Sequence, residues 1–400
     1  MYRSVLAFFS SLRLTVVLLV LSMLLIFFST LDQVTMGIRG AQQVYFESFF
    51  AVWRYPQHFW LSEYLGWFHL PLLGGAVLGP MLLLNLMAAH FKRYRGLSWR
   101  KLGISLTHGG ILLLLLALMA ASWLQEDHRM QINEGGTRNF LESFYDYEWV
   151  LVDESAESSD RVYAFPEKLL EEGTILEQPD WPFRVRVRAY YANSVLGMAD
   201  PAMPSLFSRG VGKGVWVGEA PISGRLDEPN IASASIELLG ANGESMGLWL
   251  TTTHPALAAS DGLQRFEWEG RQFAMGLRAK RTYLPFSLEL IDFSYDRYPG
   301  TERARNFSSD LRLRHEEKAT DRRVLVYMNH PLRYEGWTFY QSSFSNDERT
   351  SIFQVVTNPS WLLPYIACLL VTVGLLFQFT WRLIEAGRRM SASAAKPAAR

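Results

Sequence analysis

His108 is the residue whose type and position point most directly to chemistry, because it lies inside a long apolar segment, residues 102–124. An ionisable side chain within a membrane span is costly and marks a functional site by default. It lies about one and a half turns inside the end of the segment that we place in the cytoplasm. Gly109 and Gly110 beside it leave room for a flat ligand or for another helix. A neutral imidazole is a common axial ligand of haem iron; the alternative is that His108 only donates a hydrogen bond across a helix interface.

The other histidines have simpler explanations. His90 lies beside Lys92 and Arg93 at the end of an apolar segment, where snorkelling and phosphate contact explain it, so we interpret it as structural. One apolar span therefore offers one well-placed histidine. The remaining ones lie in polar or aromatic stretches without metal-ligand spacing: His58, His69, His128, His254, His315 and His330.

Composition excludes several classes of function. Cys368 is the single cysteine, which excludes disulfide frameworks, cysteine-rich zinc sites, iron–sulfur clusters and a CxxC redox pair within this chain. Because Cys368 is buried in an apolar segment without a charged neighbour, we expect an inert thiol. The 39 basic and 39 acidic residues leave no basic excess, which argues against nucleic-acid binding.

Four apolar segments must position His108: residues 12–31, 70–89, 102–124 and 361–381. Each is long enough to cross roughly 30 Å of hydrocarbon. Basic residues cluster between the second and third segments and after the fourth, at Lys92, Arg93, Arg95, Arg100, Lys101, Arg382, Arg388, Arg389, Lys396 and Arg400. The positive-inside rule therefore predicts that both termini are cytoplasmic and that the long segments after the first and third spans lie outside.

The large outer segment has the pattern of a β structure. Polar and apolar residues alternate at 184–191, 232–238, 247–252, 286–293, 311–314 and 323–327. Period two predicts half-buried strands, and the turn signals between them favour a sandwich or meander. Residues 167–172 are the one plausible helix. In the smaller outer loop, the aromatic-rich residues 44–53 predict either an interfacial helix at the headgroups or an ordinary packed connector.

The predicted fold is thus a polytopic α-helical membrane protein with four transmembrane helices and a large, mainly β extracytoplasmic domain. The expected parts are the N-terminus and first span (1–31), an outer loop (32–69), spans two and three with a basic loop (70–124), the β-rich domain (125–358), the fourth span (359–381) and a basic tail (382–400), disordered after Met390.

Several stretches resemble one known family. They are SLTHGGIL at 105–112, ASW at 121–123, MQINEG at 130–135, and YMNHPL at 327–332 followed by GWTFYQSSF at 336–344. Together they resemble the ResB family, also called CcsB, of system II cytochrome c biogenesis. The resemblance extends along the whole chain, from the three spans through the outer domain to the final span.

The resemblance implies a haem-handling subunit of the bacterial cytoplasmic (inner) membrane. ResB-like proteins work with a ResC- or CcsA-like membrane protein that carries a WWD segment. Together they carry haem b across the lipid bilayer and attach it to the CXXCH cysteines of apocytochrome c. Other, thioredoxin-like proteins keep those cysteine thiols reduced. By motif position, His108 is one axial ligand of the haem iron and the partner supplies the other. The chain is then a non-catalytic or co-catalytic subunit of a holocytochrome c synthase, with no catalytic residue of its own.

Two questions stay open on the sequence alone. His330 in the YMNHPL stretch either contacts haem or apocytochrome, or belongs to a segment whose Asn329, Pro331 and Tyr340 only fix turns and a strand end. The chain as a whole is either this haem-handling subunit or a membrane-anchored scaffold whose outer β domain binds a protein partner without binding haem.

Overall fold

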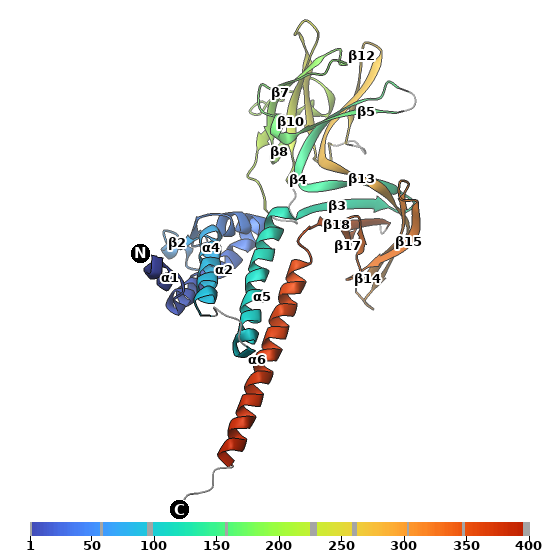
Figure 1. The fold of residues 1–400 in the computed structure, drawn as a ribbon. Helices are drawn as coiled ribbons and strands as arrows, with labels where there is room; N and C mark the ends of the chain where they lie inside the picture. The colour runs from blue at the N-terminus through green and yellow to red at the C-terminus, as the bar shows by residue number, and fades with distance from the viewer. Residues whose placement is uncertain are drawn as a thin grey trace, which may run out of the picture. The chain divides into compact units, whose positions relative to one another are not determined.

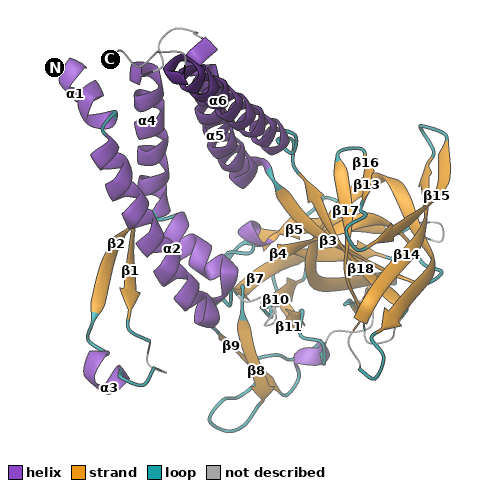
Figure 2. Cartoon of the chain, turned by 90° about the horizontal axis from the view of Figure 1, so that it is seen from below, coloured by secondary structure: helices purple, strands orange, loops and turns teal. Residues whose placement is uncertain are grey.

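A computed structural model describes residues 2–56, 59–93, 99–156, 159–224, 230–257, 262–301, 304–345 and 349–394. The chain divides into two compact units, described separately below. The first comprises Met1–Gln125, Gly224–Leu226 and Asn358–Arg400, and the second comprises Glu126–Ser223 and Asp227–Thr357. Figure 2 shows that long helices dominate the first unit and strands the second. Arg95, Lys396, Arg400 and His58 lie outside the described residues.

The helices of the first unit are α1 (Tyr2–Phe9), α2 (Leu12–Ala41), α3 (Ser62–Leu65), α4 (Gly75–Arg93), α5 (Trp99–Leu124) and α6 (Leu363–Ala394). Among the described residues, four helices are long and apolar enough to cross a membrane, in the regions of α2, α4, α5 and α6. Most of their leucine and valine side chains face outward, as a lipid environment favours.

The helix bounds differ from the predicted spans at three places. α2 continues ten residues beyond 31, residues 70–73 form a strand, and α6 continues through Ala394. The tail expected to be disordered after Met390 is therefore helical as far as it is described. Cys368 is exposed on the surface of α6 and is not buried within the helix packing.

A buried amide holds α4 against the break between α1 and α2. Asn85 is 1% exposed, and its Nδ2 donates to the carbonyl oxygens of Phe9 at 2.7 Å and Ser11 at 3.3 Å. Thr15 donates from Oγ1 to Asn85 Oδ1 at 2.7 Å. Backbone carbonyls freed by a helix break need a donor in an apolar environment, and Asn85 supplies it.

The aromatic loop after α2 does not form the helix predicted over 44–53. The chain passes from α2 into a π-helical turn (Gln42–Phe46) and then a hairpin of β1 (Phe50–Arg54) and β2 (His69–Leu73). Figure 2 shows the two strands side by side, with α3 beyond their far end. Ala51 and Trp53 are buried while Phe50 and Val52 are exposed, so the aromatic-rich run alternates with the period of a strand.

The second unit is built of antiparallel strands. Its largest sheet runs β15-β14-β13-β4-β3-β18-β17-β16, with β12 and β5 attached to β13 and β4. A second sheet has the order β11-β10-β7-β6, and β8 pairs with β9. The bounds are β3 (Glu126–Asn133), β4 (Thr137–Asp153), β5 (Arg161–Pro166), β6 (Ile175–Leu176), β7 (Arg184–Tyr191), β8 (Ser194–Met198), β9 (Val215–Glu219), β10 (Ser233–Leu239), β11 (Ser245–Thr252), β12 (Gln264–Trp268), β13 (Arg271–Arg297), β14 (Ala304–His315), β15 (Thr320–Tyr327), β16 (Leu332–Tyr334), β17 (Trp337–Phe344) and β18 (Thr350–Thr357).

Two hydrophobic cores share the long strands β4 and β13, which run side by side (Figure 1). One core contains Leu141 of β4 and Leu288 of β13, and the other contains Trp149 of β4 and Phe273 of β13. The predicted β structure is confirmed in kind, with a strand at every predicted position, but it has two cores and more than one sheet. The predicted helix at 167–172 is a short 3₁₀ turn, Glu167–Leu169.

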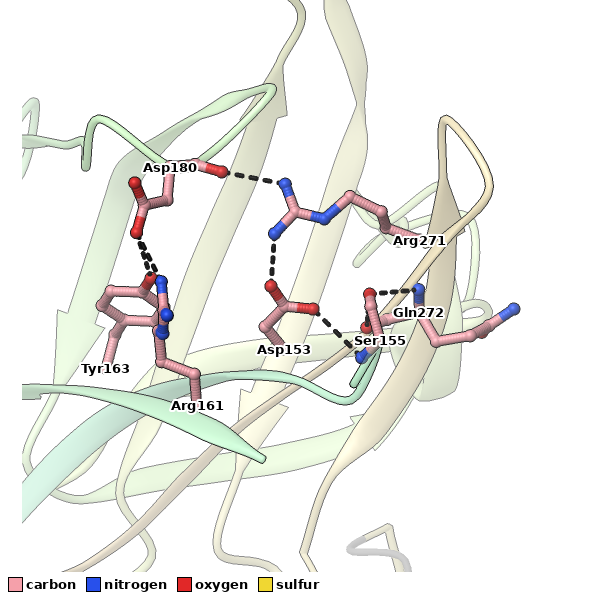
Figure 3. A network of polar contacts seen from close by, with 7 residues as sticks. All are labelled: Asp153, Ser155, Arg161, Tyr163, Asp180, Arg271 and Gln272. Carbon is pink, nitrogen blue, oxygen red and sulfur yellow. Dashed lines mark hydrogen bonds and ion pairs between the residues drawn. The ribbon is translucent and has the colours of Figure 1, made fainter. Parts of the chain in front are cut away.

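A polar network closes the end of β4 (Figure 3). Arg271 donates to the Asp153 carboxylate and, at 2.9 Å, to the backbone oxygen of Asp180. The Ser155 amide donates to Asp153 Oδ1 at 3.1 Å. Burial alone raises the pKa of Asp153, but the hydrogen bonds from Ser155 and Arg271 outweigh it and hold that pKa below its ordinary value.

We expect Asn85→Leu to lower the stability of the helical unit by about 1–2 kcal/mol, because the Phe9 carbonyl loses this donor and the Thr15 hydroxyl loses an acceptor. Thermal unfolding of the detergent-solubilised chain measures the effect. Leu84→Ala is the matched control, since Leu84 is 51% exposed on the same helix turn. Equal unfolding temperatures for both variants would contradict the role of the amide.

We expect Asp153→Asn to lower the unfolding temperature of the β unit at pH 7 by a few degrees. A depressed carboxyl pKa adds stability above the unfolded value of 3.8, and that stability is lost as the pH falls further. The difference between wild type and variant should therefore shrink below about pH 3.8. Asp180→Asn is the control, because its side chain is 54% exposed and its partners are the exposed Arg161 and, at 3.4 Å, the Tyr163 hydroxyl. If the difference in unfolding temperature between wild type and variant persists at acidic pH, the ion pair between Asp153 and Arg271 is not its cause.

Candidate functional site

Close contact between α5 and α6 fixes the rotation of the helix that carries His108. A Cβ atom on Gly110 would lie 2.7 Å from a methyl group of Val371 and 2.8 Å from the carbonyl oxygen of Ala367. One on Gly103 would lie 2.8 Å from the carbonyl oxygen of Gly374. These approaches require glycine, so the two backbones touch along an antiparallel seam (Figure 1).

His108 points away from that seam. At 3.6 residues per turn, residues 103, 107 and 110 share one side of α5, and His108 lies roughly 130° around the helix from it. A Cβ atom on Gly109 would meet no atom within 4 Å. The two glycines after His108 thus have different roles: Gly110 admits α6, and Gly109 leaves open space beside the histidine.

His90 of α4 lies against His108. The two imidazole ring centres are 6.2 Å apart and the ring planes are inclined by 76°. The interpretation of His90 as only a boundary residue missed this contact. No spacing in the sequence reports it, because residues 90 and 108 lie on two helices and their contact depends on how α4 and α5 rotate.

A pair of imidazoles suits a haem iron better than a bare metal ion. Among the described residues, no group of three or more His, Cys, Asp or Glu side chains is placed to hold a metal ion. A bare zinc or copper ion usually needs three or four protein ligands. Haem iron receives four ligands from the porphyrin and needs only axial donors, for which imidazole is common. Gly109 adds free space on the exposed side of α5.

The histidines of the β unit do not converge with one another. His128 lies in β3 with its Nε2 3.5 Å from Glu126 and its ring 5.6 Å from that of Trp337. His315 is 2% exposed, and its Nδ1 lies 3.0 Å from the Tyr334 hydroxyl. In the outer loop of the other unit, His69 is exposed at the start of β2.

The YMNHPL stretch forms a tight turn between β15 and β16. The amide of His330 donates to the Tyr327 oxygen at 2.9 Å, and the ring of His330 stacks on that of Tyr327 with centres 4.3 Å apart. Asn329 has φ +63°, a backbone conformation that asparagine tolerates well. These contacts favour the interpretation in which this segment fixes a turn.

The GWTFYQSSF stretch forms β17 and packs into the first core. Phe339 is fully buried. Gln341 accepts a hydrogen bond from Ser309 of β14 at 2.8 Å and donates one to Ser351 of β18 at 2.9 Å. Because β14 and β17 are not neighbours in the sheet order, this network joins separated strands across the curled sheet.

The fold and the paired histidines define a class: a membrane-associated protein with apolar helices, an imidazole pair between two of them, and a large β unit. Residues 257–352 match the ResB-like family. A stretch of 102 residues is 31% identical to Protein NrfI of Wolinella succinogenes, covering 26% of this chain and 11% of that protein. The part of the chain at residues 257–352 is therefore similar to the ResB-like family, as the motifs at 327–332 and 336–344 predicted. The matched residues 257–352 include the turn and β17 but not His90 or His108.

We expect Gly110→Ala and Gly109→Ala to differ sharply in stability. The added methyl group at 110 overlaps Ala367 and Val371, which should cost about 1–3 kcal/mol. At 109 the methyl group meets open space and should be neutral or stabilising. Thermal unfolding in detergent compares the two adjacent variants, and equal effects would show that the α5–α6 seam does not set the rotation of α5.

Proposed function

We propose that this chain is a haem-handling membrane subunit of cytochrome c biogenesis. The observation that carries the proposal is His108, an imidazole on an apolar helix with open space beside it and a second imidazole 6.2 Å away by ring centres. The similarity of residues 257–352 to the ResB-like family supports the link to cytochrome c biogenesis. Haem is the cargo in this proposal.

The apolar helices α2, α4, α5 and α6 cross the membrane in the proposed arrangement. Basic side chains at Lys92, Lys101 and Arg382 favour a cytoplasmic position for the α4–α5 connection and for the C-terminal end of α6. The β unit, which lies between α5 and α6 in the chain, is then on the outer side of the bacterial cytoplasmic membrane. His108 lies nearer the cytoplasmic end of α5, where haem made in the cytoplasm enters.

His108 provides an axial ligand to the iron through a neutral ring nitrogen. The apolar side chains of α5 would exclude water from the bound haem, and Gly109 would leave space beside the helix backbone. A WWD-bearing membrane partner then receives the haem and presents it to the CXXCH cysteines of apocytochrome c. The β unit supports the partner or holds apocytochrome, while other proteins keep the apocytochrome thiols reduced.

We expect His108→Ala to abolish most of the haem that co-purifies with this chain and its WWD-bearing partner. Mutations in the outer shell of metal sites already weaken binding about 10–100-fold, so loss of a ligand should reduce retained haem at least about tenfold. Haem absorbance per mole of complex is the measurement. His69→Ala serves as the matched control, because it removes an exposed histidine from the same unit.

The scaffold alternative gives the opposite result. If the chain only anchors a protein-binding domain, the wild-type complex contains no haem while the partner still co-purifies. Haem content unchanged by His108→Ala would remove His108 as a ligand even if the complex forms.

A further inference from the structure

The proposed function uses the contact between His90 and His108 as support but gives His90 no role of its own. His90 lies in the last turn of α4, three residues before its end at Arg93. Neither imidazole is fully exposed or fully buried. Each comes from a separate apolar helix, and the rotation of α5 that brings His108 here is set by its glycine seam with α6.

The spacing of the rings fits two ligands on opposite sides of one metal. A metal–imidazole nitrogen bond is about 2.0–2.1 Å, and the ring centre lies roughly 1 Å beyond the nitrogen. Two imidazoles in line through one metal therefore have ring centres about 6 Å apart, whereas ligands at a right angle have centres roughly 4.5 Å apart. The observed separation is 6.2 Å. The 76° between the ring planes is compatible with this arrangement, because each ring can turn about its metal–nitrogen bond.

We propose that His90 and His108 are the two axial ligands of one haem iron held within this chain, before the partner takes the haem. The inference rests on the proposed function and changes one element of it: the chain supplies a complete axial pair. Transfer to the partner then requires ligand exchange. One iron–nitrogen bond to this chain breaks and one bond to a donor of the partner forms, with no change in iron oxidation state and no net proton transfer.

Haemin titration of the purified full chain in lipid nanodiscs, without the partner, tests this proposal. Wild type should give the absorbance and electron paramagnetic resonance spectra of six-coordinate, low-spin iron with two imidazoles. His90→Ala should bind haemin at least about tenfold more weakly and give a high-spin spectrum. Added free imidazole should restore the low-spin spectrum of that variant by filling the vacant axial position.

His90→Gln separates a ligand from a packing or hydrogen-bonding partner. Glutamine retains polarity and much of the side-chain length, so it should restore the thermal stability of the chain if His90→Ala lowers it. It is not a usual axial ligand, so its haemin complex should stay high-spin. A low-spin complex of His90→Gln with wild-type affinity overturns the proposal.

The result for His108→Ala keeps this inference distinct from the proposed function. Weak, high-spin binding in His108→Ala with wild-type behaviour in His90→Ala would refute the pair and leave the proposed function standing. Wild-type haemin binding in both variants would refute both. His69→Ala should match wild type throughout.

Discussion

The glycine seam between α5 and α6 is the constraint on which the arrangement of the site depends. Backbone contact at Gly103 and Gly110 allows one rotation of α5, and that rotation directs His108 away from α6. The same two segments of chain continue as the paired strands β3 and β18, from Glu126 opposite Thr357 to Asn133 opposite Thr350. Between helices and strands, the Asn358 side chain donates to Gln125 at 3.4 Å. The two segments therefore run antiparallel in both units. In the helical unit α5 and α6 pair by close packing, and in the β unit β3 and β18 pair by strand hydrogen bonds.

Much of the fold could be predicted from local pattern, and the failures have local causes. Apolar length predicted the four long helices, and alternation predicted β7 residue for residue. Strand β13 was recognised only from 286, because Pro285 interrupts the pattern and the pairing with β4 shifts register between Tyr283 and Leu288. The aromatic run at 44–53 was misassigned because aromatic residues favour strands and interfaces alike. Only the burial of Ala51 and Trp53 distinguishes these cases.

Of the two histidines in the candidate site, only His108 could be predicted from the sequence. His108 stands out because an ionisable residue in an apolar helix is itself a signal. His90 does not, since its position near Lys92 has a sufficient explanation at the membrane boundary. The sequence also could not show that Gly109 and Gly110 have different roles. The difference depends on which of the two glycines faces α6. In the β unit, the motif around Gln341 lies within the residues that match the ResB-like family, but its residues act in a buried hydrogen-bond network and a core.

The two imidazoles belong to different sets of packed helices, and this bears on how a cargo can be both held and released. α4 is tied to the α1–α2 break through Asn85, whereas α5 is tied to α6 through glycines. In the proposed arrangement one ligand would come from each set of helices, so a small change in the spacing of α4 and α5 would change the distance between the imidazoles without breaking either tie. Ring centres only slightly farther apart no longer span one iron, since metal–nitrogen bonds tolerate little stretching. In the proposed arrangement, haem would be bound firmly while the helices are close and would become exchangeable when they separate.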